Sequence, residues 1–164
     1  KEGFASYEEM CDRLDITYLT EGTSSFRNID DNSIDIIISQ ACLEHVRKKE
    51  FELFMNENFR VSKKGAISVH SIDFKDHLAY SLNNLRFSEQ IWESNLFANS
   101  GFYTNRIPAL KMHSIFEEIG FKIKRKSLGK WPRLPTKRSS MHKEFDIYTD
   151  SELINRTSYV LLEK

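Results

Sequence analysis

The sequence is poor in cysteine and has no long apolar run. Its 164 residues include two cysteines, Cys11 and Cys42, which lie far apart and show no metal-type spacing. This scarcity argues against a disulfide framework and predicts a reducing, cytoplasmic compartment. No apolar run approaches the roughly 20 residues that a membrane-spanning helix requires. We therefore expect no disulfides and no membrane partner.

The chain also lacks a net charge, although its charges are unevenly distributed. It has 24 basic and 24 acidic residues, with 13 acidic and 7 basic ones in residues 1–60. Residues 119–143 carry nine Lys or Arg and no acid. Such a basic segment is either a solvated face or a rim that faces an anionic substrate. A neutral chain gives no support to nucleic-acid binding, which we do not expect.

The composition, 40% hydrophobic and 29% charged, is typical of a single compact domain over residues 1–164. Apolar runs alternate along the chain with segments of helical periodicity. This alternation predicts an α/β domain with a mainly parallel sheet and an antiparallel edge strand. The expected strands are 16–19, 34–39, 66–72, 121–128 and 157–162, and the expected helices are 1–14, 41–60, 88–97, 108–119 and 140–155.

A stretch rich in titratable groups, "HSIDFKDH", follows the third expected strand. His70 lies in the strand, and Asp73, Asp76 and His77 lie beyond its end. Since H-x2-D-x2-D-H is no established metal spacing, we predict no metal site. A histidine titrates near neutrality and a carboxylate can fix its tautomer, so His77 and His70 are candidate bases and the two aspartates would orient them. Structural roles, such as capping of the next turn, remain open.

A second polar cluster predicts substrate binding. It contains Arg86 and the run from Tyr103 to Arg106, in which Asn105 also lies. The two guanidinium groups offer forked donors that suit a carboxylate or a phosphate. Ordinary loop packing is the alternative explanation for these residues.

Two sequence segments, in this order along the chain, resemble a known protein family. "DNSIDIIISQACLEHV" (31–46) and "NFRVSKKGAISVHSID" (58–73) are similar to the second half of a class I S-adenosylmethionine-dependent methyltransferase of the type 11 kind. The segment 76–108 resembles a subfamily of bacterial methyltransferase-domain proteins. The resemblance implies the C-terminal portion of a Rossmann-like fold, with S-adenosylmethionine as cofactor and methyl transfer to a small-molecule or glycan-like, anionic acceptor.

The resemblance also implies cofactor contacts. Glu21 lies in the loop where the family places an acid near the adenine amino group of the cofactor. The end of the second expected strand and the start of the helix that follows it would line the methionine end of the cofactor. The residues concerned there are Ser39, Gln40, Ala41 and His45. The family's Gly-rich loop has no counterpart among the six isolated glycines. We therefore expect a partial methyltransferase domain that is inactive by itself, with the cofactor loop upstream.

An alternative is a non-catalytic, methyltransferase-like interaction module that binds no cofactor. A truncated sheet would expose an unpaired edge, which predicts a homo-oligomer in isolation.

Overall fold

The computed structural model describes residues 3–164 as two compact units, one up to Asp30 and the other from Asp31 to Lys164. Lys1 and Glu2, which the expected helix 1–14 includes, lie outside the described residues. The first unit contains helix α1 (Tyr7–Arg13) and the 3-10 helix η1 (Gly22–Asn28). Ser6 caps α1, because its Oγ accepts a hydrogen bond from the Glu9 backbone N–H at 3.1 Å.

The strand expected at 16–19 is wrong, because the structure has no strand there. Ile16 is 44% exposed and Tyr18 is 68% exposed. A short run of β-branched and aromatic residues becomes a strand only when a neighbouring strand satisfies its backbone groups. None of the sheet's ladders includes this run.

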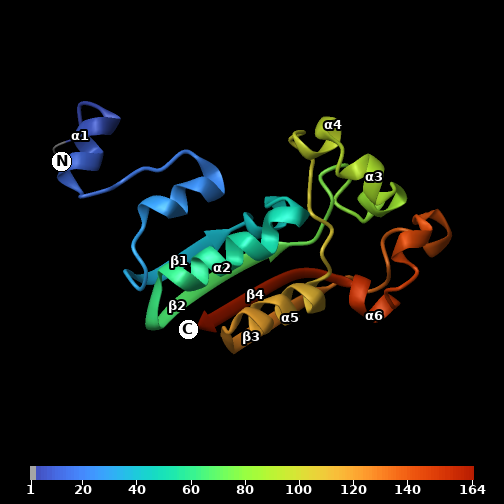
Figure 1. Ribbon diagram of the computed structural model, residues 1–164. Coiled ribbons are helices and arrows are strands. Elements are labelled where there is room, and N and C mark those ends of the chain that lie inside the picture. Colours follow the sequence, from blue (N-terminus) through green and yellow to red (C-terminus); the bar gives the residue numbers. More distant parts are fainter. Residues whose placement is uncertain (1–2) are drawn as a thin grey trace. The chain divides into compact units, whose positions relative to one another are not determined.

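The second unit is built on a four-stranded sheet of order β1-β2-β4-β3 (Figure 1). Strands β1 (Ile34–Gln40) and β2 (Ser62–Asp73) are parallel, whereas β4 (Asn155–Glu163) pairs antiparallel with β2 and with β3 (Lys122–Lys130). Three of the four strands therefore share one direction, and β4 opposes them. The α/β fold with a mixed sheet is confirmed, and β3 is an edge strand in an antiparallel pair.

Two amphipathic helices, α2 (Phe51–Val61) and α5 (Ala109–Ile119), cover one face of the sheet (Figure 1). Their apolar stripes meet the covered face in one core, which contains Leu43, Phe51, Met55, Ile72, Ile107, Met112, Ile115, Phe116, Phe121, Val160 and Leu162. Gly120 ends α5 with φ of 118°, where a side chain would be strained and its Cβ would lie 3.1 Å from the Phe59 ring. The helix expected at 108–119 is thus confirmed.

The other four expected helices are shorter in the structure than in the sequence prediction: 1–14 contains α1, and 41–60 is α-helical only from Phe51, where α2 begins. The expected helix 88–97 is split into α3 (Glu89–Trp92) and α4 (Asn95–Ala98), and most of 140–155 consists of single turns before α6 (Asp150–Leu153). The remaining single turns are η2 (Leu43–His45), η3 (Lys48–Glu50), η4 (Asn83–Arg86), η5 (Arg138–Ser140) and η6 (Lys143–Phe145). A second apolar cluster packs the segments around η4, η5, η6 and α6 together through Leu82, Leu85, Met141, Phe145 and Leu153.

The other face of the sheet carries exposed apolar side chains. Ile36, Ile38, Val69 and Tyr159 are 62%, 75%, 40% and 58% exposed. They alternate along their strands with buried residues such as His70 and Val160, as side chains of a sheet with one covered face do. Self-association through this surface or the free edge of β1 stays a prediction.

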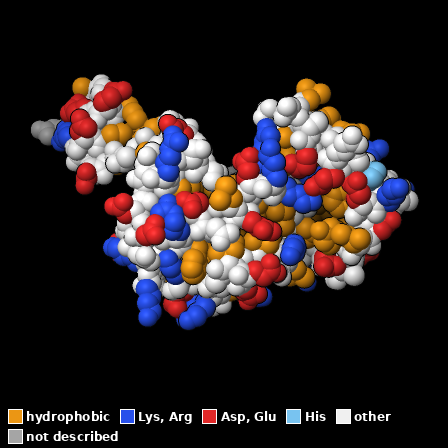
Figure 2. All heavy atoms as spheres, in the orientation of Figure 1, with side chains coloured by type: hydrophobic (Ala, Val, Ile, Leu, Met, Phe, Trp, Pro, Cys, Tyr) orange, Lys and Arg blue, Asp and Glu red, His pale blue; other side chains and the backbone are white. Residues whose placement is uncertain are grey.

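The visible surface mixes charges of both signs (Figure 2). No helix in the described part of the chain is long and apolar enough to cross a membrane.

Candidate functional site

The carboxyl ends of β1 and β2 lie side by side and bring two connecting segments together. Ser39 pairs with His70 and Gln40 with Ser71 in the parallel register, and the Ala41 N–H donates to the Ser71 carbonyl at 2.9 Å. Ala41 has φ of 48°, which is uncommon for a residue other than glycine and marks a sharp exit from the strand. Ligands of open α/β sheets bind at this end of the strands.

His45 and His77 meet at this end of the sheet, although the sequence analysis assigned them to different sets. Their ring centroids are 4.9 Å apart in an edge-on arrangement. The His45 Nδ1 lies 2.7 Å from the Tyr103 carbonyl oxygen, which can only accept a hydrogen bond. Nδ1 therefore carries a proton, and in the neutral ring Nε2 is the nitrogen with a free lone pair. His77 is exposed and His45 is half-buried, so both are placed to meet a bound molecule.

Glu44 is the site residue that the sequence analysis missed. It is 2% exposed, its Oε1 accepts from the Asp73 N–H at 3.2 Å, and its Oε2 has no hydrogen-bond partner. Burial raises the pKa of this carboxyl from 4.5 to about 7, a nearby Asp73 adds to the rise, and backbone hydrogen bonds and His77 oppose it. Its only sequence signal is its place beside His45 after a buried strand.

His70 lies on the covered face of the sheet. It is 1% exposed, its Nδ1 is 2.7 Å from the Ser39 Oγ, and its ring stacks against Phe116 with centroids 6.2 Å apart. Burial lowers its pKa from 6.5 to about 4, so the ring is neutral at pH 7. These contacts support a structural role for His70 and occupy the Ser39 hydroxyl as well.

Asp76 organises the loop that follows β2. Its side chain is fully buried, and Oδ1 accepts from the backbone N–H groups of Leu78, Ala79 and Ser81 at 3.0, 2.7 and 3.3 Å. Its Oδ2 accepts from the Asn83 N–H. Four backbone donors thus converge on one carboxylate, which supports the structural alternative for this residue.

Asp73 has a more modest local role. Its Oδ1 accepts from the Lys75 N–H at 2.9 Å, and its Oδ2 lies 3.1 Å from the Lys75 Nζ. Its backbone N–H holds Glu44, so it positions that carboxyl. A role in orienting His77 stays a prediction.

Three of the four predicted substrate-binding residues make internal contacts. The Tyr103 hydroxyl donates to Glu93 at 2.9 Å, and Asn105 Nδ2 donates to the Leu43 and Val46 carbonyls at 2.8 and 3.0 Å. The Asn105 bonds tie the segment after α4 to the η2 region, which follows β1.

Arg106 is the third of these internal residues, and its side chain is fully buried. Its Nη2 lies 2.7 Å from a Glu89 oxygen, and its guanidinium lies over the Trp92 and Phe145 rings. Arg86, by contrast, is exposed and free to meet an anion.

Glu21 belongs to the first unit, where it is exposed. Its carboxylate pairs with Arg27, and its N–H donates to the Ser25 Oγ at 3.0 Å. Gln40, in the second unit, is exposed at the end of β1.

Among residues 3–164, no group of three or more His, Cys, Asp or Glu side chains could hold a metal ion.

The burial of His70 leads to a prediction about pH and stability. Between pH 6.5 and about 4 the unfolded chain binds a proton that the folded chain does not, so the free energy of unfolding falls as the pH falls through this window. His70→Leu removes this proton uptake and should reduce the slope by about 1.4 kcal/mol per pH unit. Urea unfolding across the window measures the slope, and His142→Leu, at a partly exposed position, is the control. Equal slopes for His70→Leu and the parent chain would show that His70 binds its proton to the same extent in the folded and unfolded states.

Comparisons with known proteins agree with the fold. Residues 5–70 match a family model described as a methyltransferase domain. A SAM-dependent methyltransferase from Archaeoglobus fulgidus is 11% identical with a TM-score of 0.57, over 97% of this chain and 73% of that one. Another from Methanosarcina mazei is 17% identical with a TM-score of 0.59, over 91% and 67%. No curated protein matches the sequence.

A third solved structure is described as a SAM-dependent methyltransferase, possible histamine N-methyltransferase, from Thermotoga maritima. It is 14% identical with a TM-score of 0.52, over 95% of this chain and 68% of that one. The family model over residues 5–70 and the fold shared with these SAM-dependent methyltransferases agree with the resemblance seen in the sequence.

S-adenosylmethionine is the cofactor that this fold implies, and the strand ends fit part of it. Gln40 and Ala41 are exposed at the end of β1, with backbone and amide groups suited to the polar methionine end. His45 lies just beyond them. Ser39 does not fit, because its hydroxyl is engaged by His70.

Proposed function

We propose that this chain forms the acceptor side of an S-adenosylmethionine-dependent methyltransferase whose acceptor is a small, glycan-like and partly anionic molecule. The observation that carries the proposal is the meeting of His45, His77 and Glu44 at the carboxyl ends of two parallel strands. Methyl-transfer assays use the complete product of the gene that encodes this chain.

The cofactor supplies an electrophilic methyl group when bound, so the protein's task is largely positioning and proton removal. Gln40, Ala41 and His45 would hold its methionine end, and a role of Glu21 at the adenine amino group stays a prediction. Exposed Arg86 would meet a negative group of the acceptor through its forked donors.

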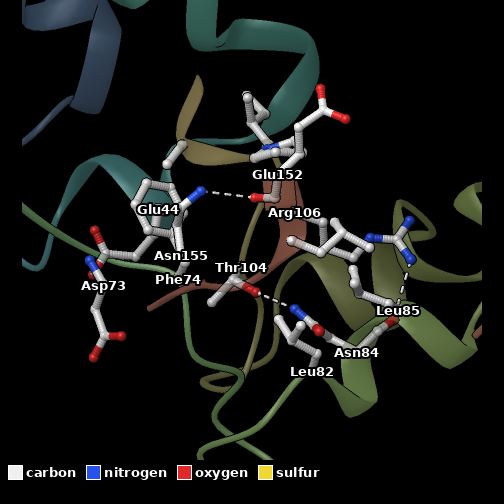
Figure 3. A pocket seen from close by; sticks show the side chains of 14 residues that line it. Glu44, Asp73, Phe74, Leu82, Asn84, Leu85, Thr104, Arg106, Glu152 and Asn155 are labelled. Carbon is white, nitrogen blue, oxygen red and sulfur yellow. Dashed lines mark hydrogen bonds between the residues drawn. The ribbon is translucent and has the colours of Figure 1, made fainter. Parts of the chain in front are cut away.

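Proton removal falls to the histidine pair. An acceptor hydroxyl or amine must lose its proton, and His77 is exposed at the strand ends with a ring that contacts His45. The Tyr103 carbonyl fixes the His45 tautomer, which leaves Nε2 able to accept a hydrogen bond from the acceptor or from His77. Glu44, which precedes His45 in the chain and lines the pocket drawn in Figure 3, provides a buried carboxyl that interacts electrostatically with His77.

His77→Ala tests the base role. In the complete gene product we expect transfer of the labelled methyl group to fall by about 10²-fold, which is typical for the loss of a general base. Calorimetric titration should show unchanged affinity for S-adenosylmethionine, because His77 lies on the acceptor side.

The control is His142→Ala, a histidine outside the site that we expect to leave both binding and transfer unchanged. If His77→Ala retained full methyl transfer, the base role would be wrong. If it lost cofactor binding as well, His77 would belong to the cofactor site.

A further inference from the structure

The outer edge of strand β3 is open to another strand. β3 is the last strand in the order β1-β2-β4-β3 and pairs with β4 alone. On such an edge, alternate residues direct their backbone N–H and C=O groups away from the sheet. No backbone hydrogen bond from another segment of residues 3–164 reaches these outward groups. The edge therefore presents a ladder that an extended chain can complete.

The central part of β3 has a regular register. Residues 125–129 pair one by one with β4, and the register shifts of this ladder lie to either side, next to Ile123 and next to Lys130. A bulge leaves a residue unpaired and bends its strand. A strand that pairs along residues 125–129 meets no such interruption.

The side chains of β3 give the edge a single sign of charge. Five of its nine residues are basic and none is acidic, and the five are Lys122, Lys124, Arg125, Lys126 and Lys130. All five are exposed. Lys124 lies 3.4 Å from a Glu163 oxygen, whereas the other four have no ion-pair partner within the described part of the chain. Most of this positive charge is therefore available to a partner.

Arg125 and Lys126 present this charge on both faces of the sheet. Lys126 pairs with Val160, which belongs to the core under the helices, and Arg125 pairs with Leu161, the next residue of β4. Successive side chains of a strand point to opposite faces. Two adjacent acidic residues on an added strand could therefore each lie opposite one of these charges.

The charge of the edge selects the class of partner. If β3 paired with β3 of a second copy, Lys and Arg side chains would lie opposite one another, which destabilises a sheet. A segment rich in Asp or Glu would meet opposite charges at the same positions. Nucleic acid could also meet the charges, but it has no row of backbone N–H and C=O groups that would complete the ladder.

We propose that the outer edge of β3 is a docking site for an acidic, extended segment of a partner protein, which adds a strand to the sheet beside residues 125–129. Main-chain hydrogen bonds provide affinity, and the basic side chains select acidic segments. The site needs neither cofactor nor methyl acceptor and lies at the opposite end of the strand order from β1. It is therefore independent of the proposed methyl transfer.

The test is a nuclear magnetic resonance titration of this chain at physiological salt, where charges far from the edge are screened. The probe is a short peptide of alternating threonine and valine with two adjacent glutamates at its centre. One matched peptide has lysines in place of the glutamates, and another keeps the glutamates but has every backbone nitrogen methylated. We expect saturable shifts of the β3 backbone N–H signals with the acidic, unmethylated peptide alone.

A pair of variants tests the residues. Arg125→Glu combined with Lys126→Glu should weaken the affinity for the acidic peptide about tenfold, because two attractive pairs become repulsive. Lys49→Glu combined with Lys143→Glu changes the net charge equally at exposed positions outside β3 and should leave the affinity unchanged. If the first variant does not fold, Arg125→Gln combined with Lys126→Gln replaces it, and the three peptides with the parent chain still decide.

Three results would overturn the proposal. Absence of saturable shifts with the acidic peptide would show that the basic side chains only protect the edge. Equal binding of the methylated peptide would show attraction between charges without strand addition. Tighter binding of single-stranded DNA of similar length, with shifts of the same signals, would assign the edge to nucleic acid.

Discussion

Asp76→Ala is expected to lower the free energy of unfolding by about 3–5 kcal/mol. The substitution removes a fully buried side chain that accepts hydrogen bonds from four backbone N–H groups of its loop, and leaves several of these groups unpaired. Urea unfolding followed by circular dichroism gives the change. Asp76→Asn keeps one carbonyl oxygen, so we expect a smaller loss, about half as large.

The control for Asp76 is an aspartate at the surface. Asp146 has a side chain that is 70% exposed, and Asp146→Ala should change stability by no more than about 0.5 kcal/mol. If Asp76→Ala were as stable as the parent but lost methyl transfer in the complete gene product, Asp76 would have the catalytic role that the sequence pattern suggested and no structural one.

Glu44→Gln is expected to stabilise the protein at pH 8 and to impair its reaction. The folded carboxyl has a pKa of about 7, above its ordinary 4.5. Between these values the folded chain retains a proton that the unfolded chain releases, so stability falls as the pH rises through this window. Glutamine cannot ionise, and above pH 7 its gain should approach about 3 kcal/mol.

Methyl transfer by the same variant should fall by about 10- to 100-fold, because an amide replaces the titratable carboxyl beside the histidine pair. Thermal unfolding at pH 5 and pH 8 (roughly the two sides of the window), together with a labelled-methyl assay, measures both effects. Glu118→Gln, at an exposed carboxylate, is the control. A variant less stable than the parent at pH 8, with full activity, would show that Glu44 is ionised and structural.

The sequence predicted the elements whose pattern is local. The apolar run at 34–39, the Gly-terminated helix at 108–119 and the alternating strand at 121–128 are all present. The run at 16–19 has similar residue types but no partner strand, and a strand depends on its partner for hydrogen bonds.

The site was predictable only in outline. The polar stretch after β2 was recognised, and the fold brings His77 to His45. The sequence could not separate His77, which is exposed, from His70 and Asp76, which are buried, because burial depends on α5 and on the loop's own turns. Glu44 gave no periodic signal, since it lies in a single turn between β1 and α2.

We propose above that the carboxyl ends of β1 and β2 form part of a methyltransferase site. Calorimetric titration with S-adenosylmethionine tests it most directly, on this chain and on the complete gene product, each with Gln40 intact and with Gln40→Ala. We predict binding by the complete gene product that Gln40→Ala weakens. Binding by neither protein would contradict the claim and favour an interaction module that uses the methyltransferase fold without its cofactor.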